Sequence, residues 1–356
     1  MRSSFHTFNL EGIKPQAVCN GGTRSIANTD NFNILKGMSL YSLHLDKGGV
    51  REPHWHPNAV ELGYCLTGRA IMTIFSPGAG HDTFTVDAGE IVFVPGGYLH
   101  HIENIYEGET KFAIAFNHER PEDIGISGAA GSMVDKVLGY TFNVDSQYFS
   151  NFKKKHPHDI LITSKESVTT TTTVTTTTYK SKIPNRHKFN LKGIPPVVQT
   201  KGGTASFATA NNFEILYGLA CALLTLRHKG IREPHWHPNT AELDYVISGK
   251  ARMTIFGPGD SVDTFEVGPG EIVFIPPAYF HYIENIGDND DEDMQFAIFF
   301  NHERPEDLGI SGSFGAYSNE VLASIFGVQP TTLLDSLPKY QEDLFIVEGG
   351  GERRAA

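Results

Sequence analysis

The most informative stretch of the sequence is Arg51-Glu-Pro-His54-Trp-His56-Pro-Asn58. It occurs a second time as Arg232-Glu-Pro-His235-Trp-His237-Pro-Asn239, and this repetition reveals how the chain is built. The two copies are offset by 181 residues, and the same offset separates His100 from His281. The offset grows to 184 after the acidic turn at residues 287–293, which is longer than its partner in the first copy. A constant offset over two long segments indicates a duplicated domain with one surface-loop insertion.

A low-complexity stretch lies between the two copies. Threonines run from Thr169 to Thr178, broken only by Val174. Such a stretch has too few apolar side chains to pack as a core, and it is typical of a linker. We therefore expect residues 1–162 to form the first domain, 163–182 a threonine-rich linker and 183–356 the second domain.

Charge and composition exclude several classes of partner. The 356 residues carry 29 Lys and Arg against 41 Asp and Glu, a net charge of −12, whereas nucleic acids and anionic membranes are bound by clustered basic residues. No run approaches the roughly 20 apolar residues that span a bilayer, and the first residues lack the apolar core of a signal peptide. We expect a cytoplasmic protein that binds neither nucleic acid nor membrane.

Short apolar or alternating segments bounded by Gly, Pro, Asn or Asp predict β structure in both copies. Only the segments after Ser132 and Ser318 space their apolar residues as a helix does. We therefore expect an all-β protein of two tandem barrels, each with a short C-terminal helical extension. The strands predicted in the first copy are Leu40–Leu45, Glu61–Leu66, Ala70–Phe75, Ile91–Val94 and Lys111–Phe116.

The repeated His-Trp-His is typical of a metal site. Residues two apart on a strand face the same side, so His54 and His56 point together. Glu61 and a third histidine, His100, follow in each copy at the same intervals. Three nitrogens and one carboxylate oxygen leave two positions open on an octahedral ion, which suits Mn²⁺ or Fe²⁺ better than a closed Zn²⁺ site. We predict about two ions per chain, Mn²⁺ first and Fe²⁺ second, bound by His54, His56, Glu61 and His100 and by His235, His237, Glu242 and His281.

These motifs resemble those of the cupin family. The metal set followed by Gly68, and the segment Gly89-Glu-Ile-Val-Phe-Val-Pro95 before His100, are similar to the two cupin motifs, and the second copy matches equally. Two such domains carrying Arg-Glu-x-His-Trp-His resemble the bicupin oxalate decarboxylases. The resemblance implies jelly-roll-type barrels, one Mn²⁺ per domain, conversion of oxalate to formate and CO₂, and a homo-oligomer, either a trimer or a hexamer.

The resemblance also implies a substrate-binding arginine. In the family it follows the metal glutamate in a Gly-x-Ala-Arg-x-Thr-Ile strand, which the second copy keeps as Gly249-Lys-Ala-Arg252-Met-Thr-Ile255. The first copy has Ile71 at that position. A guanidinium can hold a carboxylate through two parallel hydrogen bonds. We therefore expect Arg252 to bind a small carboxylate substrate and the second site to carry most of any turnover.

The family's lid, a Ser-Glu-Asn-Ser type loop with a proton-donating glutamate, is replaced in both copies by Asn-His-Glu-Arg-Pro-Glu-Asp, within residues 117–128 and 301–312. Acids in this replacement loop are candidate general acids if the loop closes over the site. A solvated, salt-bridged loop is the simpler interpretation. The candidate lid acids are Glu119, Glu122, Glu303 and Glu306, next to Asp123 and Asp307.

Three functions remain open from the sequence. The first is a manganese enzyme that resembles oxalate decarboxylase. The second is a metal-binding or storage protein without turnover, which the altered lid favours. The third is an Fe²⁺ or Mn²⁺ dioxygenase that uses the same ligands on an apolar substrate.

Overall fold

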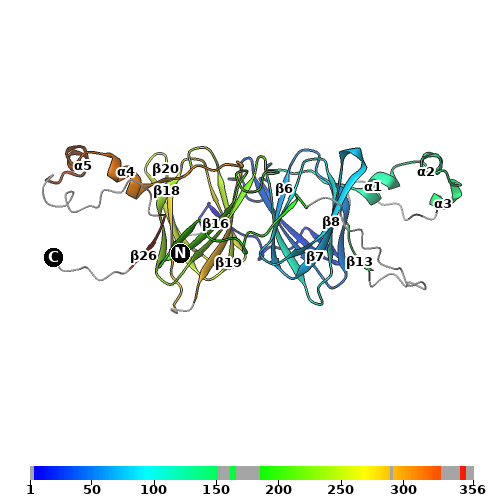
Figure 1. The fold of residues 1–356 in the computed structure, drawn as a ribbon, viewed down its shortest axis with the longest axis horizontal. Helices are drawn as coiled ribbons and strands as arrows, with labels where there is room; N and C mark the ends of the chain where they lie inside the picture. The colour runs from blue at the N-terminus through cyan, green and yellow to red at the C-terminus, as the bar shows by residue number, and fades with distance from the viewer. Residues whose placement is uncertain are drawn as a thin grey trace. The chain divides into compact units, whose positions relative to one another are not determined.

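The computed structural model describes residues 4–150, 152, 161–165, 185–288, 292–329 and 345–349. The chain forms two compact units (Figure 1): the first barrel consists of residues 10–193, and the second barrel of residues 1–9 together with 194–356. In the described part of the chain, no helix is long and apolar enough to cross a membrane.

The first barrel consists of two antiparallel sheets whose facing sides enclose one apolar core. Its seven-stranded sheet has the order β14 (Lys188–Phe189), β9 (Ile91–Val94), β6 (Glu61–Thr67), β11 (Thr110–Phe116), β4 (Ser39–Leu45), β3 (Gly22–Ala27), β2 (Ala17–Cys19). Its six-stranded sheet has the order β12 (Ile124–Gly125), β5 (Gly49–Trp55), β10 (Leu99–Asn104), β7 (Arg69–Ser76), β8 (Gly80–Asp87), with β13 (Ile162–Ser164) also paired to β5. A 3-10 turn, η1 (Pro77–Ala79), joins β7 to β8.

The second barrel repeats this arrangement around its own core. Its seven-stranded sheet has the order β1 (Thr7–Asn9), β22 (Glu271–Ile275), β19 (Glu242–Ser248), β24 (Met294–Phe300), β17 (Ala220–Leu226), β16 (Gly203–Ala208), β15 (Val198–Thr200). Its six-stranded sheet has the order β21 (Ser261–Val267), β20 (Ala251–Gly257), β23 (Phe280–Asn285), β18 (Gly230–Trp236), β25 (Leu308–Gly309), with β26 (Ile346–Glu348) also paired to β18.

The predicted all-β fold with two jelly-roll barrels is confirmed. The five strands predicted in the first copy are β4, β6, β7, β9 and β11, and their bounds agree within one residue at each end. Alternating side chains build the core, as the β-strand period requires: in β7, Ala70, Met72 and Ile74 point inward while the residues between them are more exposed.

The predicted domain boundaries are wrong at both ends, because each barrel takes its outermost strand from the other copy. β1, near the start of the chain, pairs with β22 of the second barrel, and β14, at the start of the second copy, pairs with β9 of the first. The predicted linker also begins too early, since Thr163 and Ser164 belong to β13. The rest of that linker, residues 166–182, lies outside the described residues.

Short helices follow β12 in the first copy and β25 in the second. The predicted helices after Ser132 and Ser318 are confirmed as α2 (Asp135–Phe142) and α5 (Asn319–Phe326). The sequence did not reveal α1 (Ile126–Gly131) and α4 (Ile310–Ala316), because their Gly and Ser residues have low helix propensity. A further turn, α3 (Gln147–Ser150), follows α2.

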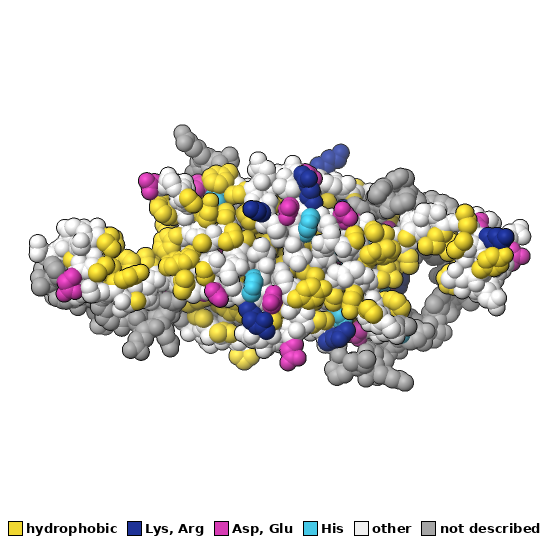
Figure 2. All heavy atoms as spheres, turned by 90° about the horizontal axis from the view of Figure 1, so that it is seen from above, with side chains coloured by type: hydrophobic (Ala, Val, Ile, Leu, Met, Phe, Trp, Pro, Cys, Tyr) yellow, Lys and Arg dark blue, Asp and Glu magenta, His cyan; other side chains and the backbone are white. Residues whose placement is uncertain are grey.

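The helical extensions expose apolar side chains. Figure 2 shows hydrophobic atoms over the helical extensions. Tyr140 and Phe142 of α2 and Ile325 and Phe326 of α5 are all more than half exposed. Exposed apolar surface of this kind is typical of protein contacts. A homo-oligomer, trimer or hexamer, stays a prediction.

Candidate metal centres

Neighbouring strands bring the predicted ligands together in each barrel. His54 on β5 lies directly opposite His100 on β10, and Glu61 opens β6 in the facing sheet. In each of the two sets, all four ligand atoms lie within 4.8 Å of one another and all four residues are buried. The structure therefore brings together all eight residues that the sequence predicts as ligands.

In each set the glutamate lies between two histidines. In the first barrel, Oε2 of Glu61 is 3.0 Å from Nε2 of His56 and 3.1 Å from Nε2 of His100. In the second barrel, Oε2 of Glu242 is 2.7 Å from Nε2 of His237 and 3.3 Å from Nε2 of His281. The donor atoms of each set thus converge on one point inside the barrel.

Backbone carbonyls fix the tautomer of every histidine in the sets. In the first barrel, Nδ1 of His54, His56 and His100 donates to the carbonyl oxygens of Glu52, Glu122 and Tyr98 over 2.7, 2.8 and 3.0 Å. Nδ1 of His235, His237 and His281 donates in the same way to Glu233, Glu306 and Tyr279 over 2.7, 2.7 and 2.9 Å. With its proton on Nδ1, each ring presents the lone pair of Nε2, which is what a metal ligand requires.

In the first set burial alone would lower the pKa of His100, but the neighbouring ionised Glu61 raises it, whereas the pKa of His54 is lowered. Burial, with the nearby Arg51, lowers the pKa of His54 well below its usual value. Burial alone would raise the pKa of Glu61, but His100 and His56 together hold it below its usual value. A neutral imidazole and an ionised carboxylate are the ligand forms that divalent ions bind. In the second barrel Nε2 of His237 and His281 and Oε2 of Glu242 are buried without a hydrogen-bond partner. The residues therefore fit a divalent metal ion.

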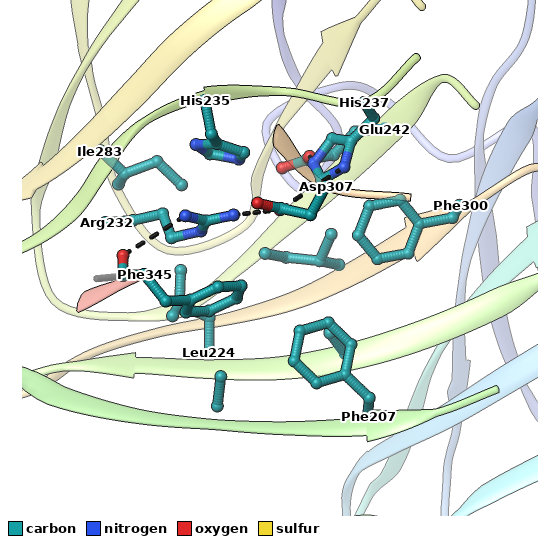
Figure 3. A pocket seen from close by; sticks show the side chains of 13 residues that line it. Phe207, Leu224, Arg232, His235, His237, Glu242, Ile283, Phe300, Asp307 and Phe345 are labelled. Carbon is teal, nitrogen blue, oxygen red and sulfur yellow. Dashed lines mark hydrogen bonds and ion pairs between the residues drawn. The ribbon is translucent and has the colours of Figure 1, made fainter. Parts of the chain in front are cut away.

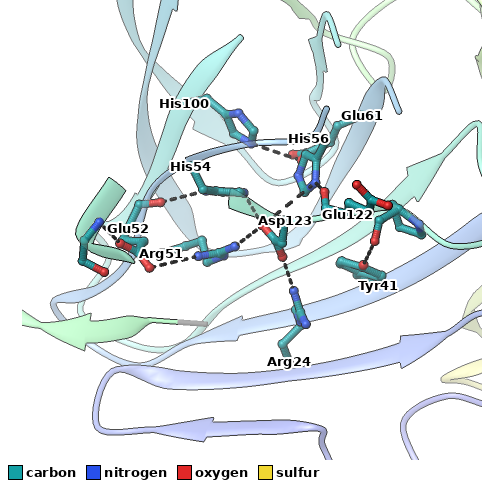
Figure 4. Close-up of polar contacts among 12 residues, drawn as sticks. Arg24, Tyr41, Arg51, Glu52, His54, His56, Glu61, His100, Glu122 and Asp123 are labelled. Atoms are coloured by element: carbon teal, nitrogen blue, oxygen red, sulfur yellow. Dashed lines mark hydrogen bonds and ion pairs between the residues drawn. The ribbon is translucent and has the colours of Figure 1, made fainter. Parts of the chain in front are cut away.

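A carboxylate and two guanidiniums lie beside the first set (Figure 4). Asp123 accepts a hydrogen bond from Arg51 over 2.5 Å and another from Arg24 over 2.5 Å. An oxygen of Asp123 is also 3.9 Å from Nε2 of His54. Burial opposes ionisation of Asp123, but Arg51, His56 and Arg24 lower its pKa to about 2. The first pocket is thus lined by a largely buried, ionised carboxylate shared between two arginines.

The second pocket has the same acid but only one arginine (Figure 3). Asp307 pairs with Arg232, whose second contact is the carbonyl oxygen of Phe345 at 3.3 Å. Ala205 is the residue of the second copy that is equivalent to Arg24. Burial raises the pKa of Asp307 despite the opposing effect of Arg232. The two acids, equivalent in the repeat, therefore differ in the direction of their pKa shifts because one cation is missing.

The expectation that Arg252 binds substrate is wrong. Arg252 lies on the outer side of β20, with 44% of its side chain exposed, and its nearest charged partner is Glu266 at 3.6 Å. Its neighbours Ala251 and Met253 point into the core instead. Arg232 lines the pocket in its place.

The four predicted lid glutamates lie outside the pockets. Oε2 of Glu119 and of Glu303 accepts the backbone N–H of Gly37 and of Gly218, over 2.9 and 3.0 Å. Glu122 and Glu306 are exposed and contribute only their carbonyl oxygens to His56 and His237. Asp123 and Asp307, one residue further along, are the loop acids that line the pockets.

A regularity in the sequence could have identified the aspartates and the arginines. Arg51 and Asp123 both recur in the second copy, as Arg232 and Asp307. A charged pair kept in both copies of a duplicated domain fits a buried ion pair better than two solvated residues, because exposed charges vary freely. Arg24 could not have been found in this way, since the second copy lacks it.

Comparisons with known proteins agree with this geometry. A family model described as Cupin matches residues 8–148 and 189–333. The oxalate decarboxylase OxdC of Bacillus subtilis is 28% identical over 294 residues, which are 82% of this chain and 74% of the relative. An oxalate decarboxylase of Arthroderma benhamiae is 27% identical over 319 residues, 83% of this chain and 74% of the relative. A solved structure concerned with the Mn(II) centres of Bacillus subtilis oxalate decarboxylase has a TM-score of 0.84 at 24% identity, with 98% of this chain and 90% of that chain covered.

Proposed function

Because the chain belongs to the cupin family, as a bicupin of the oxalate decarboxylase-like group, we propose that it is a manganese-dependent enzyme that acts on a small carboxylate. The reaction we propose first is the conversion of oxalate to formate and CO₂. The relatives that share both barrels are named oxalate decarboxylases. The metal sets, with three nitrogens and one oxygen each, suit Mn²⁺, with Fe²⁺ as the alternative.

One observation carries the proposal: the first pocket holds two arginines against a single aspartate beside the metal set. Arg24 and Arg51 are both at least 95% buried, and Asp123 is their shared partner. A buried dianion is costly unless cations receive it. A manganese ion at His54, His56, Glu61 and His100 would act as a Lewis acid toward one carboxylate, and the arginines would hold the other.

Asp123 has two tasks in this scheme. Its carboxylate occupies the guanidinium of Arg51, so an incoming carboxylate must displace it. The enclosed space in the pocket is only about 20 Å³, so the segment that carries Asp123 must move for a substrate to enter. Conversion of oxalate to formate places a proton on carbon as CO₂ leaves. Asp123 is ionised while it pairs with the arginines, but a substrate that displaces it from Arg51 removes a charge that lowers its pKa, so its carboxylate can then take up a proton and pass it on.

The first barrel is therefore the proposed reaction site, which revises the expectation that the second site carries most of the turnover. That expectation rested on Arg252, which lies outside the pocket. In the second barrel Arg232 is matched by Asp307, and no second arginine is among the described residues that line the pocket. A dianion is better compensated in the first pocket because one positive charge remains after the aspartate is paired.

The test is an oxalate, formate and CO₂ assay on manganese-loaded protein with two matched lysine variants. Arg51→Lys keeps the positive charge but removes the planar guanidinium and its parallel N–H donors. We expect a loss of about tenfold to a hundredfold in kcat/KM with manganese retained. Arg252→Lys makes the same change on the outer face and should leave kcat/KM unchanged. Full activity of Arg51→Lys would contradict the proposal. A wild-type protein that holds manganese and turns over no small carboxylate would favour the metal-storage function.

A further inference from the structure

The repeat allows the two pockets to be compared position by position. Arg51 corresponds to Arg232, and the facing acids and metal sets are the same in both barrels. The clearest differences lie on the sheet that faces the metal set, at two neighbouring strands. There Arg24 is replaced by Ala205, and Tyr41 by Ala222.

In the first barrel these two side chains form a polar wall. Cζ of Arg24 is 4.6 Å from the centre of the Tyr41 ring, and the tyrosine hydroxyl donates to the carbonyl oxygen of Pro121 over 3.4 Å. Outside this wall Gln16 is hydrogen-bonded to the backbone of Ile26 in both directions, at 2.8 and 3.3 Å. The rim of the first pocket is therefore polar.

In the second barrel aromatic rings take over this region (Figure 3). Phe207 replaces Ile26, and its ring centre lies 5.8 Å from that of Phe345 in an edge-on arrangement. Val197 stands where the first copy has Gln16. Arg232 lies with its Cζ 3.5 Å from the centre of the Phe345 ring, so the charged group is covered by an apolar face.

A vestibule, half of whose lining residues are apolar, leads to the second metal set. It is a cavity of about 370 Å³, and five of its residues also line the metal pocket. Three of those five are phenylalanines. The shared residues are Phe207, His237, Phe300, Asp307 and Phe345. A cavity of this size holds a ring-sized molecule in contact with a metal ligand.

The backbone of Phe345 indicates that its ring position is specified. Phe345 has a φ of 58°, a left-handed conformation that costs a bulky side chain free energy. Glu233 holds it there, because its Oε1 accepts the Phe345 N–H over 2.6 Å and its own N–H donates to the Phe345 carbonyl over 2.9 Å. Leu161 occupies the corresponding place in the first copy with an ordinary φ. The backbone strain at Phe345 occurs in the second pocket, whereas the equivalent residue of the first pocket lacks it. This difference points to a role of Phe345 in binding.

We propose that the second pocket binds a different class of ligand from the first: an aromatic monocarboxylate. Its carboxylate reaches the set of His235, His237, Glu242 and His281 beside Arg232, and its ring lies in the vestibule between Phe207 and Phe345. The ligand carries one negative charge, because Arg232 is already matched by Asp307. This site does not depend on oxalate turnover in the first barrel.

The probe is benzoate, compared with acetate by titration calorimetry on the full metal-loaded chain. The two anions share one charge and one coordinating group, and only benzoate fills the vestibule. We expect one benzoate site per chain with an affinity about tenfold or more above that of acetate. Equal affinities for benzoate and acetate would overturn the proposal.

Swaps between the two copies locate the site. Phe345→Leu installs the first-barrel residue and should weaken benzoate about three- to tenfold by removing the aromatic contact. Ala205→Arg restores the first-barrel arginine and should weaken it more, because the side chain fills the entrance. Tyr41→Ala makes the opposite swap, since it installs the second-barrel residue in the first barrel, and it should leave benzoate affinity unchanged.

The outcomes separate this proposal from the proposed function. Loss of benzoate affinity in Phe345→Leu supports the second site whether or not oxalate is a substrate. Unchanged affinity in both Phe345→Leu and Ala205→Arg, with thermal melting showing that the variants are folded, would overturn it even if Arg51→Lys abolishes oxalate turnover. Loss of benzoate binding in Tyr41→Ala would place the ligand in the first barrel and would also overturn the proposal of a second-barrel site.

Discussion

Arg51 and Asp123 form a partly buried ion pair of 2.5 Å beside the first metal set, and Arg24 reaches the other oxygen of the same carboxylate. The aspartate comes from the loop that follows β11, whereas the arginines come from opposite sheets. Under the proposed function, an anionic substrate and Asp123 therefore compete for the guanidinium of Arg51. Under the proposed function, this loop is a lid whose closed form is held by the same arginines that bind the substrate.

Replacement of the acid should separate binding from turnover. Asp123→Asn removes the competing charge, so we expect KM for oxalate to fall several-fold, while kcat falls by about a hundredfold or more because the proton carrier is lost. Steady-state kinetics measure both values. Glu122→Gln changes the exposed neighbour and serves as the control. A variant in which KM and kcat stay at wild-type values would exclude Asp123 from both tasks.

Each metal set should empty independently. His56→Ala should reduce the metal content from about two ions per chain to about one, with the remaining ion in the second barrel, and His237→Ala should do the reverse, because the ligand sets share no residue. Elemental analysis of the purified variants gives the number. His101→Ala removes a histidine next to a ligand but outside both sets and should retain both ions. Loss of both ions in either ligand variant would contradict independent sites.

Two equivalent buried histidines should stabilise different barrels. Nδ1 of His6 donates to the carbonyl oxygen of Phe274 over 2.8 Å, and Nδ1 of His187 donates to that of Phe93 over 3.0 Å. Burial lowers the pKa of both, so both bond as neutral rings. His6→Ala should destabilise the second barrel, and His187→Ala the first, by about 1–3 kcal/mol each, because a buried carbonyl loses its donor.

Scanning calorimetry of the metal-free protein tests this pair. Each variant should lower one unfolding transition and leave the other in place, and the affected transition should differ between the two variants. A His6→Ala protein that melts with the affected transition of His187→Ala would show that the first residues do not complete the second barrel.

The stability of the first barrel should depend on pH through His44. Burial alone would lower its pKa, but Glu11, at 2.9 Å from Nε2, and Glu109 raise it. A raised folded-state pKa adds stability that is fully present below about pH 6.5 and is lost as the pH rises through the folded value. Glu11→Gln should therefore lower the melting temperature at pH 6 and have a smaller effect at pH 9.

The second barrel provides the internal control for this prediction. Lys192 and Thr225 stand at the positions of Glu11 and His44, so the second copy has no such pair. Its unfolding transition should not respond to Glu11→Gln at either pH. A larger effect at pH 9 than at pH 6 would have the wrong sign for a raised histidine pKa.

The eight metal ligands could be predicted because local rules suffice for them. His54 and His56 lie two apart, and a strand turns such residues to one side. The duplication repeats every interval, so Glu61 and His100 were recognisable without knowing which strands become neighbours. The strands themselves follow from the alternation of apolar residues, which is a property of each segment alone.

The arginines show where local rules fail. Arg232 and His235 are three apart, which on a regular strand puts them on opposite sides, yet both line the pocket because the pairing of β18 with β23 shifts register between them. Such an irregularity reverses the facing of one side chain relative to the next. The prediction for Arg252 failed for a related reason. The turn before β20 passes through Gly249 at a φ of 76°, so the alternation of side chains between the two faces cannot be extrapolated from the preceding strand into β20.

The sequence by itself determined the duplicated barrels, their strands and the two ligand sets, because these depend on period, spacing and repetition. Only the tertiary structure decided which charges face the metal sets and which barrel each edge strand completes. β1 and β14 have nearly the same sequence surroundings, and each pairs with a strand of the other copy. These pairs join residues that are far apart in the sequence, so they depend on how the whole chain folds and cannot be found from the pattern of either segment alone.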